Sequence, residues 1–215
     1  MNEDPKSPRA REFSRRAFLQ SAGLAGVAAG CASTPSESAG GTPPQGLGPG
    51  AVPVTLKVNG REIRLELEPR VTLLDALRDH FEAGGGRPVD LTGSKRVCDR
   101  GSCGACTVIL DGRTAYACSI LAVDAQGREI RTVESFEKAG ALHPVQEEFL
   151  ACDGLMCGFC TPGFVVSSVA LLERNPSPTR EEIRRALDGN ICRCGTQPRS
   201  LEAVEKAAAR MKGRR

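Results

Sequence analysis

Cys98-Asp99-Arg100-Gly101-Ser102-Cys103-Gly104-Ala105-Cys106 is the stretch that decides the fold, and a fourth cysteine, Cys118, follows twelve residues later. The spacing C-x4-C-x2-C with a distant fourth cysteine is one that holds a [2Fe-2S] cluster with four thiolates. Gly101 and Gly104 suit such a loop, because glycine adopts positive φ and has no Cβ to obstruct backbone N–H groups that point at the cluster. Zinc and disulfides are the alternatives, but zinc ligands usually come as two short pairs.

The composition indicates a small core that is poor in aromatic side chains. The 215 residues include ten cysteines, no tryptophan, one tyrosine and seven phenylalanines. We therefore expect metal–ligand bonds to supply part of the stability, and the apo-protein to be poorly folded. The length allows one or two small domains but no additional large catalytic domain. A formal net charge of +3 gives no reason to expect nucleic-acid binding.

Residues 1–31 have the layout of an export signal. Arg15 and Arg16 precede Phe18-Leu19 and a short apolar run at residues 22–29. That run is too short to span a bilayer, which needs about 20 residues, but it fits a signal peptide. The paired arginines resemble a twin-arginine signal and predict a periplasmic location, because this route carries folded proteins whose clusters are already inserted. An amphipathic first helix is the alternative.

Cys31 and the segment after it predict how the signal is joined to the rest of the chain. Cys31 follows Val27-Ala28-Ala29-Gly30, which is similar to a bacterial lipoprotein cleavage site. A lipid on Cys31 would anchor the protein to a membrane surface. Ordinary cleavage near Ala32 and an uncleaved signal are the alternatives. Residues 32–51 are rich in Pro, Gly and Ser and read as a flexible linker.

Residues 52–134 alternate strand and helix signals in the order of a β-grasp ferredoxin domain. Apolar residues alternate on both sides of Asn59-Gly60, which predicts a hairpin with a type I′ turn. Thr72 begins a helical pattern that the glycines at 84–86 end. After Cys106 we expect a strand at 107–110 and a second hairpin turn at Asp111-Gly112, which returns the chain to Cys118. Residues 130–133 could add a last strand.

Residues 135–215 have a helical pattern with four expected helices. Pro144 can begin the first, with Val145, Phe149 and Leu150 on one face. The second covers residues 164–172. Thr179 and Glu182 form a capping box for the third, and the fourth extends from about Pro198 to Met211.

A second set of cysteines lies among these helices and comprises Cys157, Cys160, Cys192 and Cys194. Each close pair is followed by a proline, Pro162 or Pro198, that can occupy the first position of a helix. Each pair is therefore expected just outside a helix N-terminus. The partial positive charge of such an end suits a cluster that carries net negative charge.

The two sets in this order resemble the small iron–sulfur subunit of molybdenum hydroxylases, the xanthine oxidase family. The resemblance covers about residues 53–211 and includes Gly104, Ala105 and Thr161-Pro162-Gly163. It implies an α+β protein with an N-terminal β-grasp plant-type ferredoxin domain at 52–134 and a C-terminal four-helix [2Fe-2S]-binding domain at 135–215. Together with the export signal, the layout is similar to periplasmic aldehyde oxidoreductases.

The resemblance also implies an electron-transfer subunit with two [2Fe-2S] clusters. A large subunit with molybdopterin would oxidise aldehydes or N-heterocycles, and an FAD-binding medium subunit or a cytochrome would accept the electrons. The cluster nearer the molybdenum would be held by Cys157, Cys160, Cys192 and Cys194, and the one nearer the acceptor by Cys98, Cys103, Cys106 and Cys118. The sequence departs from the family at Met156, commonly Gln, and at Val97, commonly Gly.

The remaining polar residues indicate no catalysis of bond chemistry on this chain. No Ser-His-Asp or paired-carboxylate constellation can be argued, so we expect no catalytic residue. Cys152 reads as a small buried helix residue, and His80 and His143 as surface or capping residues. Arg193 could neutralise cluster charge, meet a partner or be solvated. The competing functions are a stand-alone exported ferredoxin-like carrier, whose helical domain binds zinc or nothing, and a disulfide-stabilised module.

Overall fold

The structure is a computed structural model that describes residues 46, 48–80 and 91–213 of the chain. The expected export signal, Cys31, most of the linker and the glycines at 84–86 lie outside these residues. From Gly46 onward the chain forms one compact unit. Within the described part, no helix is long and apolar enough to cross a membrane.

A mixed five-stranded sheet forms one half of this unit, with strands in the order β2-β1-β5-β3-β4. Neighbouring strands are antiparallel, except that β1 and β5 run parallel. The strands are β1 (Val52–Val58), β2 (Arg61–Leu67), β3 (Thr107–Leu110), β4 (Arg113–Tyr116) and β5 (Glu129–Arg131). Together with the helices, the sheet makes this an α+β protein, as expected.

Both expected hairpin turns are present. Asn59 and Gly60 have φ angles of 51° and 77°, and Asp111 and Gly112 have 48° and 77°. Positive φ at both central residues defines the type I′ turn, whose twist matches that of the flanking strands. The first turn sets the register in which Val58 pairs with Arg61. The second returns the chain toward Cys118.

The first hydrophobic core lies between the sheet and helix α2 (Leu73–Asp79). The alternating residues Val54, Leu56 and Val58 of β1 are all buried in it. Thr72 caps α2, because its hydroxyl accepts a hydrogen bond from the Asp75 N–H at 3.1 Å. His80 follows as the C-cap residue. Two short 3-10 helices, η2 (Ala117–Ser119) and η3 (Ala122–Ala125), connect β4 to β5, and a third, η4 (Val133–Ser135), follows β5.

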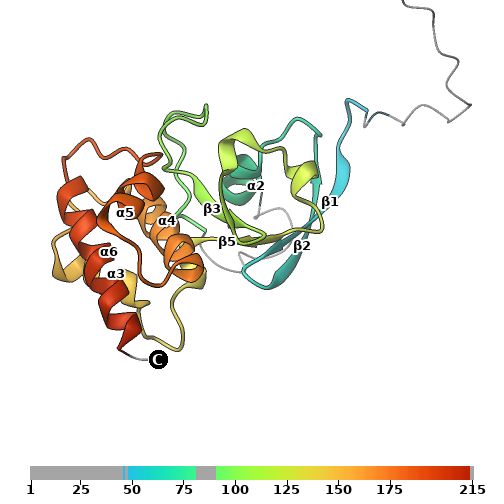
Figure 1. Cartoon of the computed structure of the whole chain (residues 1–215). Helices are drawn as coiled ribbons and strands as arrows, with labels where there is room; N and C mark the ends of the chain where they lie inside the picture. Colours follow the sequence, from blue (N-terminus) through green and yellow to red (C-terminus); the bar gives the residue numbers. More distant parts are fainter. Residues whose placement is uncertain (1–45, 47, 81–90, 214–215) are drawn as a thin grey trace, which may run out of the picture. The chain divides into compact units, whose positions relative to one another are not determined.

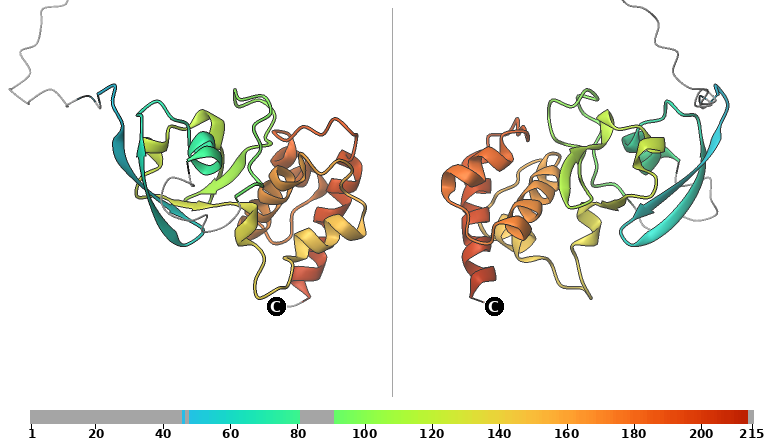
Figure 2. Two further views of the ribbon diagram at one scale, coloured as in Figure 1. Left: turned by 180° about the vertical axis from the view of Figure 1, so that it is seen from behind. Right: turned by 45° about the vertical axis from the view of Figure 1, so that its right-hand side comes forward.

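Four helices form the second half and enclose the second hydrophobic core. They are α3 (Pro144–Ala151), α4 (Thr161–Arg174), α5 (Arg180–Leu187) and α6 (Gln197–Lys212). Figures 1 and 2 show them gathered on one side of the sheet, with α4 beside β3. The expected capping box of α5 is present between Thr179 and Glu182, and Pro144 begins α3 as expected.

Strand β3 is shared by the two cores. Val108 and Leu110 face the sheet core with α2, whereas Ile109 packs in the helical core with α4. All four residues of β3 are buried for this reason. The first cysteine loop, which ends at β3, is therefore attached to both halves of the molecule.

Two local expectations need correction. Leu150 does not join Val145 and Phe149 in the core, because its side chain is 58% exposed. Pro162 and Pro198 are the second residues of α4 and α6 instead of the first, since Thr161 and Gln197 begin these helices. Position N2 also lacks an intrahelical acceptor for its N–H, so proline is tolerated there as well.

Candidate iron–sulfur centres

The first cysteine loop winds with its N–H groups turned toward sulfur. Asp99, Gly101 and Gly104 all have positive φ, at 54°, 71° and 70°. The Gly101 N–H donates to Cys118 Sγ at 3.2 Å, and the Ser102 N–H donates to Cys98 Sγ at 3.4 Å. Successive N–H groups in such a turn form a concave site for an anion. The expectation for the two glycines is therefore confirmed.

The β3–β4 hairpin returns the fourth cysteine of this set to the loop. The Ala117 N–H donates to the Cys106 carbonyl oxygen at 3.3 Å, which places Cys118 next to Cys106. These two thiols lie within hydrogen-bonding reach of each other. Cys103 is in the same relation to Cys98. The first set is thus two neighbouring pairs of thiols.

Hydrogen bonding and burial give these thiols different acidities. Hydrogen bonds from the Ser102 hydroxyl and from the Arg100 N–H lower the pKa of Cys98 to about 6. Burial raises the pKa of Cys106 to about 12. A bound metal favours the thiolate at both positions, so cluster binding would release protons from this set.

The second set lies at the N-termini of α4 and α6. Cys160 is the N-cap residue of α4, and Cys192 accepts a hydrogen bond at 3.0 Å from the hydroxyl of Thr196, the N-cap residue of α6. The Cys194 and Cys157 sulfurs are 3.5 Å apart, and Cys160 lies within hydrogen-bonding reach of Cys192. This set also forms two pairs, and the expected placement outside two helix ends is confirmed.

Acidities in the second set follow the same pattern. Burial raises the pKa of Cys160 to about 12. Burial also acts to raise the pKa of Cys192, but hydrogen bonds from the Thr196 hydroxyl and N–H outweigh it and lower this pKa to about 7. The N–H of Phe159 lowers the pKa of Cys157. Both helix N-termini favour negative charge at this place.

The sulfur separation in one of these pairs fits ligands that share one metal of an iron–sulfur cluster. A disulfide requires its sulfurs about 2.05 Å apart, whereas two sulfurs that each lie about 2.3 Å from one tetrahedral metal are about 3.8 Å apart. The separation of 3.5 Å between Cys157 and Cys194 is close to the second value. Among the described residues, no three His, Cys, Asp or Glu side chains are arranged to hold a single metal ion. A [2Fe-2S] cluster instead takes two thiolates on each of two irons, which is the paired arrangement seen in both sets.

The two sets differ in their access to solvent. Cys106 and Cys118 of the first set are buried, while Cys98 and Cys103 are partly buried. In the second set Cys157 and Cys194 are exposed, and so is Arg193 between two of its cysteines. Their neighbours Met156 and Phe159 are 63% and 50% exposed. Two exposed thiols of the second set therefore lie near exposed apolar side chains.

The other residues singled out in the sequence have local structural roles. His143 caps α3, because its Nδ1 accepts a hydrogen bond from the Val145 N–H at 3.2 Å. His80 is the C-cap residue of α2, so the capping interpretation is confirmed for both histidines. Cys152 is the C-cap residue of α3 and is partly buried, rather than buried within the helix.

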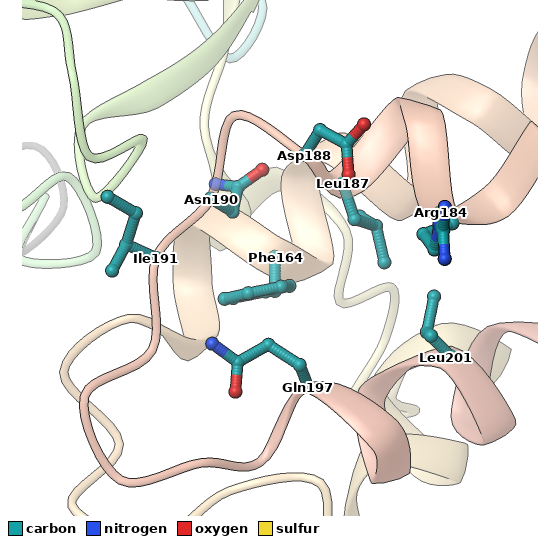
Figure 3. Close-up of a pocket in the computed structure, with 8 residues that line it drawn as sticks. All are labelled: Phe164, Arg184, Leu187, Asp188, Asn190, Ile191, Gln197 and Leu201. Carbon is teal, nitrogen blue, oxygen red and sulfur yellow. The ribbon is translucent and has the colours of Figure 1, made fainter.

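Sequence reasoning missed the segment that connects the two sets, residues 189–191 between α5 and Cys192. Asn190 is a buried polar residue, 7% exposed, and it hydrogen-bonds to α4 and to the first cysteine loop. Figure 3 shows Asn190 and Ile191 on this segment. Gly189-Asn190 reads as an ordinary loop in the sequence. A buried loop amide is revealed only by its partners in the fold.

Comparisons with known proteins identify the class to which this arrangement belongs. Residues 132–205 match the [2Fe-2S] binding domain family. The aldehyde oxidoreductase iron–sulfur-binding subunit PaoA of Escherichia coli is 43% identical over 179 residues, which cover 76% of this chain and 75% of the relative. The nicotine 6-hydroxylase small subunit of Paenarthrobacter nicotinovorans is 46% identical over 71% of this chain and 87% of the relative.

Solved structures agree with these relatives. Quinoline 2-oxidoreductase from Pseudomonas putida 86 matches with a TM-score of 0.69 and 36% identity, over 76% of this chain and 97% of that chain. The aldehyde oxidoreductase from Desulfovibrio desulfuricans matches with a TM-score of 0.68 and 40% identity, over 75% of this chain but only 17% of that chain. In the second protein the matching part thus belongs to a much longer polypeptide. The chain described here belongs to the family of [2Fe-2S] iron–sulfur subunits of molybdenum hydroxylases.

Proposed function

We propose that this chain is the electron-transfer subunit of a molybdenum-dependent oxidoreductase and carries two [2Fe-2S] clusters. Its relatives include an aldehyde oxidoreductase subunit and a nicotine hydroxylase subunit. The substrate oxidised on the molybdenum-containing partner subunit is therefore either an aldehyde or an N-heterocycle. The chemistry that the bound clusters would supply is one-electron transfer.

The observation that carries this proposal is the pairing of thiols in two separate sets. Cys98 with Cys103, and Cys106 with Cys118, would hold the irons of the first cluster. The second cluster would be held by the pairs Cys157 with Cys194 and Cys160 with Cys192. The N–H groups of Gly101 and Ser102 and the hydroxyl of Thr196 would stabilise thiolate charge in the bound state.

The difference in exposure supports an order of transfer. The exposed pair Cys157 and Cys194 lies among Met156 and Phe159, so we place the large molybdopterin-binding subunit on this surface. The first set would then pass electrons to the acceptor, either an FAD-binding medium subunit or a cytochrome. Substrate binding and bond chemistry belong to the partner, and the role of this chain is to hold, space and shield the electron carriers.

The sheet and α2 are proposed to be a β-grasp ferredoxin domain that ends near Glu134, with the helical [2Fe-2S]-binding domain after it. Support comes from the strand order, in which β1 and β5 lie side by side and parallel, and from α2 packed on the sheet. The two hydrophobic cores are consistent with this boundary, apart from Ile109 of β3, which packs in the helical core.

We also propose export to the periplasm by a twin-arginine signal in residues 1–31, with 32–51 as a linker. Arg15 and Arg16 support this from the sequence. Lipid attachment at Cys31, which would fix the protein to a membrane surface, is an additional hypothesis.

Purification of the chain from its own organism with a tag tests the proposal. We expect it to copurify with a large subunit that contains molybdenum. In that complex, the Cys194→Ser variant should no longer let substrate reduce the first cluster. Dithionite should still reduce that cluster. Cys103→Ser should leave the second cluster reducible by substrate but stop transfer to the acceptor.

Two results would contradict this assignment. Recovery of the chain without a molybdenum-containing partner would favour a stand-alone ferredoxin-like carrier. Normal turnover of both variants with the physiological acceptor would contradict the serial order.

A further inference from the structure

Within the part of the chain that the structure describes, one backbone hydrogen bond joins the two cysteine sets. The N–H of Ile191, which adjoins Cys192, donates to the carbonyl oxygen of Cys103 at 2.9 Å. Cys192 belongs to the second set and Cys103 to the first. The segment 189–191 therefore connects the second cysteine set to the first through this hydrogen bond.

The side chain of Asn190 holds this segment against both halves of the molecule. Its Nδ2 donates to the Gly104 carbonyl oxygen at 3.0 Å and lies 3.4 Å from Thr107 Oγ1. Its Oδ1 accepts from the Ser167 hydroxyl on α4 at 2.7 Å. One buried amide thus ties α4 and the connecting segment to the end of the first cysteine loop.

Backbone atoms at this junction approach as closely as glycine allows. A Cβ on Gly104 would lie 2.4 Å from the Gly189 carbonyl oxygen, and one on Gly163 would lie 2.3 Å from the Gly104 carbonyl oxygen. The Tyr116 hydroxyl also donates to the Gly189 oxygen at 3.2 Å. The junction therefore has one narrow arrangement in which all these contacts are made.

One side of the segment is tightly packed, and another side borders a pocket. A pocket of about 330 Å³ lies beside it, lined by Asn190 and Ile191 together with Phe164, Leu187 and Gln197 among others (Figure 3). The hydrogen bonds of the Asn190 amide, together with those made by the Gly189 oxygen and the Ile191 N–H, oppose displacement of the segment toward this pocket.

We propose that Asn190 is a positioning residue that sets the separation of the two clusters and thereby the rate of electron transfer between them. The inference rests on the proposed function. In the step concerned, one electron leaves the reduced cluster of the second set and enters the oxidised cluster of the first, and no bond or proton is exchanged. Electrons from the partner's substrate, or from dithionite, supply the reducing equivalent.

The test compares three variants in the complete enzyme complex. Asn190→Asp keeps an acceptor for the Ser167 hydroxyl but replaces the donor to the Gly104 oxygen with a carboxylate oxygen. Ser167→Ala removes only the 2.7 Å bond to Oδ1. Thr179→Ala is the matched control, because it removes the capping box of α5 in the same domain without touching the junction. For each variant we would measure four quantities: the iron content, the rate of electron transfer between the clusters, the magnetic interaction of the two reduced clusters and the hydrogen exchange of the Ile191 N–H.

For Asn190→Asp we expect full iron content, slower transfer between the clusters than in the wild type, a weaker magnetic interaction and faster exchange at Ile191. Ser167→Ala should produce smaller changes in the same direction, and Thr179→Ala should change none of these quantities. If Asn190→Asp fails to assemble both clusters, Ser167→Ala decides the matter, and a wild-type transfer rate in that variant overturns the proposal.

Wild-type transfer in Asn190→Asp, or equal slowing in Thr179→Ala, would also overturn the proposal. If the wild-type complex carries two clusters and Asn190→Asp transfers electrons between them at the wild-type rate, this inference is refuted and the proposed function still stands. A wild-type complex without two distinguishable clusters would instead refute the proposed function.

Discussion

Replacing Gly104 by alanine should destabilise the protein far more than the same change at another glycine with positive φ. Gly104 has φ +70°, and an added Cβ would lie 2.4 Å from the Gly189 oxygen and 2.5 Å from Asn190 Nδ2. Gly127 has nearly the same φ, +72°, but a Cβ there would meet nothing within 4 Å. Gly127→Ala is therefore a control for backbone conformation without the steric clash.

The magnitude follows from two contributions. A left-handed conformation costs a non-glycine residue about 1–2 kcal/mol, which applies to both variants. Overpacking against a fixed carbonyl oxygen adds about 1–3 kcal/mol at Gly104 alone. We therefore expect a loss of about 2–5 kcal/mol for Gly104→Ala and about 1–2 kcal/mol for Gly127→Ala. The difference corresponds to a thermal midpoint lower by about 2–12 °C, at about 2–4 °C per kcal/mol for a domain of this size.

Thermal unfolding of the cluster-loaded protein, followed by circular dichroism and by loss of visible colour, measures this difference. The colour of Gly104→Ala should bleach at the lower temperature together with its secondary structure. Equal midpoints for Gly104→Ala and Gly127→Ala would refute the close packing of the first loop on residues 189–190.

Other predictions concern a cap, metal removal and export. Burial lowers the pKa of His143, so the unfolded chain takes up a proton first and stability should fall as the pH drops below about 6.5. His143→Asn, a cap that does not titrate, should show a flatter decline from about pH 7 to about pH 5 in urea unfolding. Stripping the metal with dithionite and a chelator should lower the thermal midpoint and bring the circular dichroism toward that of an unfolded chain, and a fully folded apo-protein would contradict this. Replacing both Arg15 and Arg16 by lysine should leave the protein in the cytoplasm, and cell fractionation with immunoblotting would detect this. Normal export of that variant would contradict the twin-arginine assignment.

Features specified by neighbouring residues were predictable from the sequence. Asn59-Gly60 produced the expected turn because few dipeptides adopt positive φ at both positions. Thr179 and Glu182 formed the expected capping box, since both partners lie within one helical turn. The cysteine spacing likewise placed each set on a loop next to a strand or a helix end. These features depend on local geometry and not on the rest of the fold.

Features that depend on distant contacts were not predictable. Leu150 fits the apolar periodicity of α3, but whether another element covers it is decided by tertiary packing, and it is exposed. Asn190 finds its partners 23 and 86 residues away, in Ser167 and Gly104. No local pattern specifies such pairs, so the connection between the cysteine sets became visible only in the folded chain.

The central claim is that two separate sets of paired thiols each hold a [2Fe-2S] cluster, and the most direct test is the iron and acid-labile sulfide content of the purified protein. We expect about four irons and about four sulfides per chain, with two distinguishable electron paramagnetic resonance signals after reduction. About two irons per chain and a single signal, in correctly folded protein, would contradict the account.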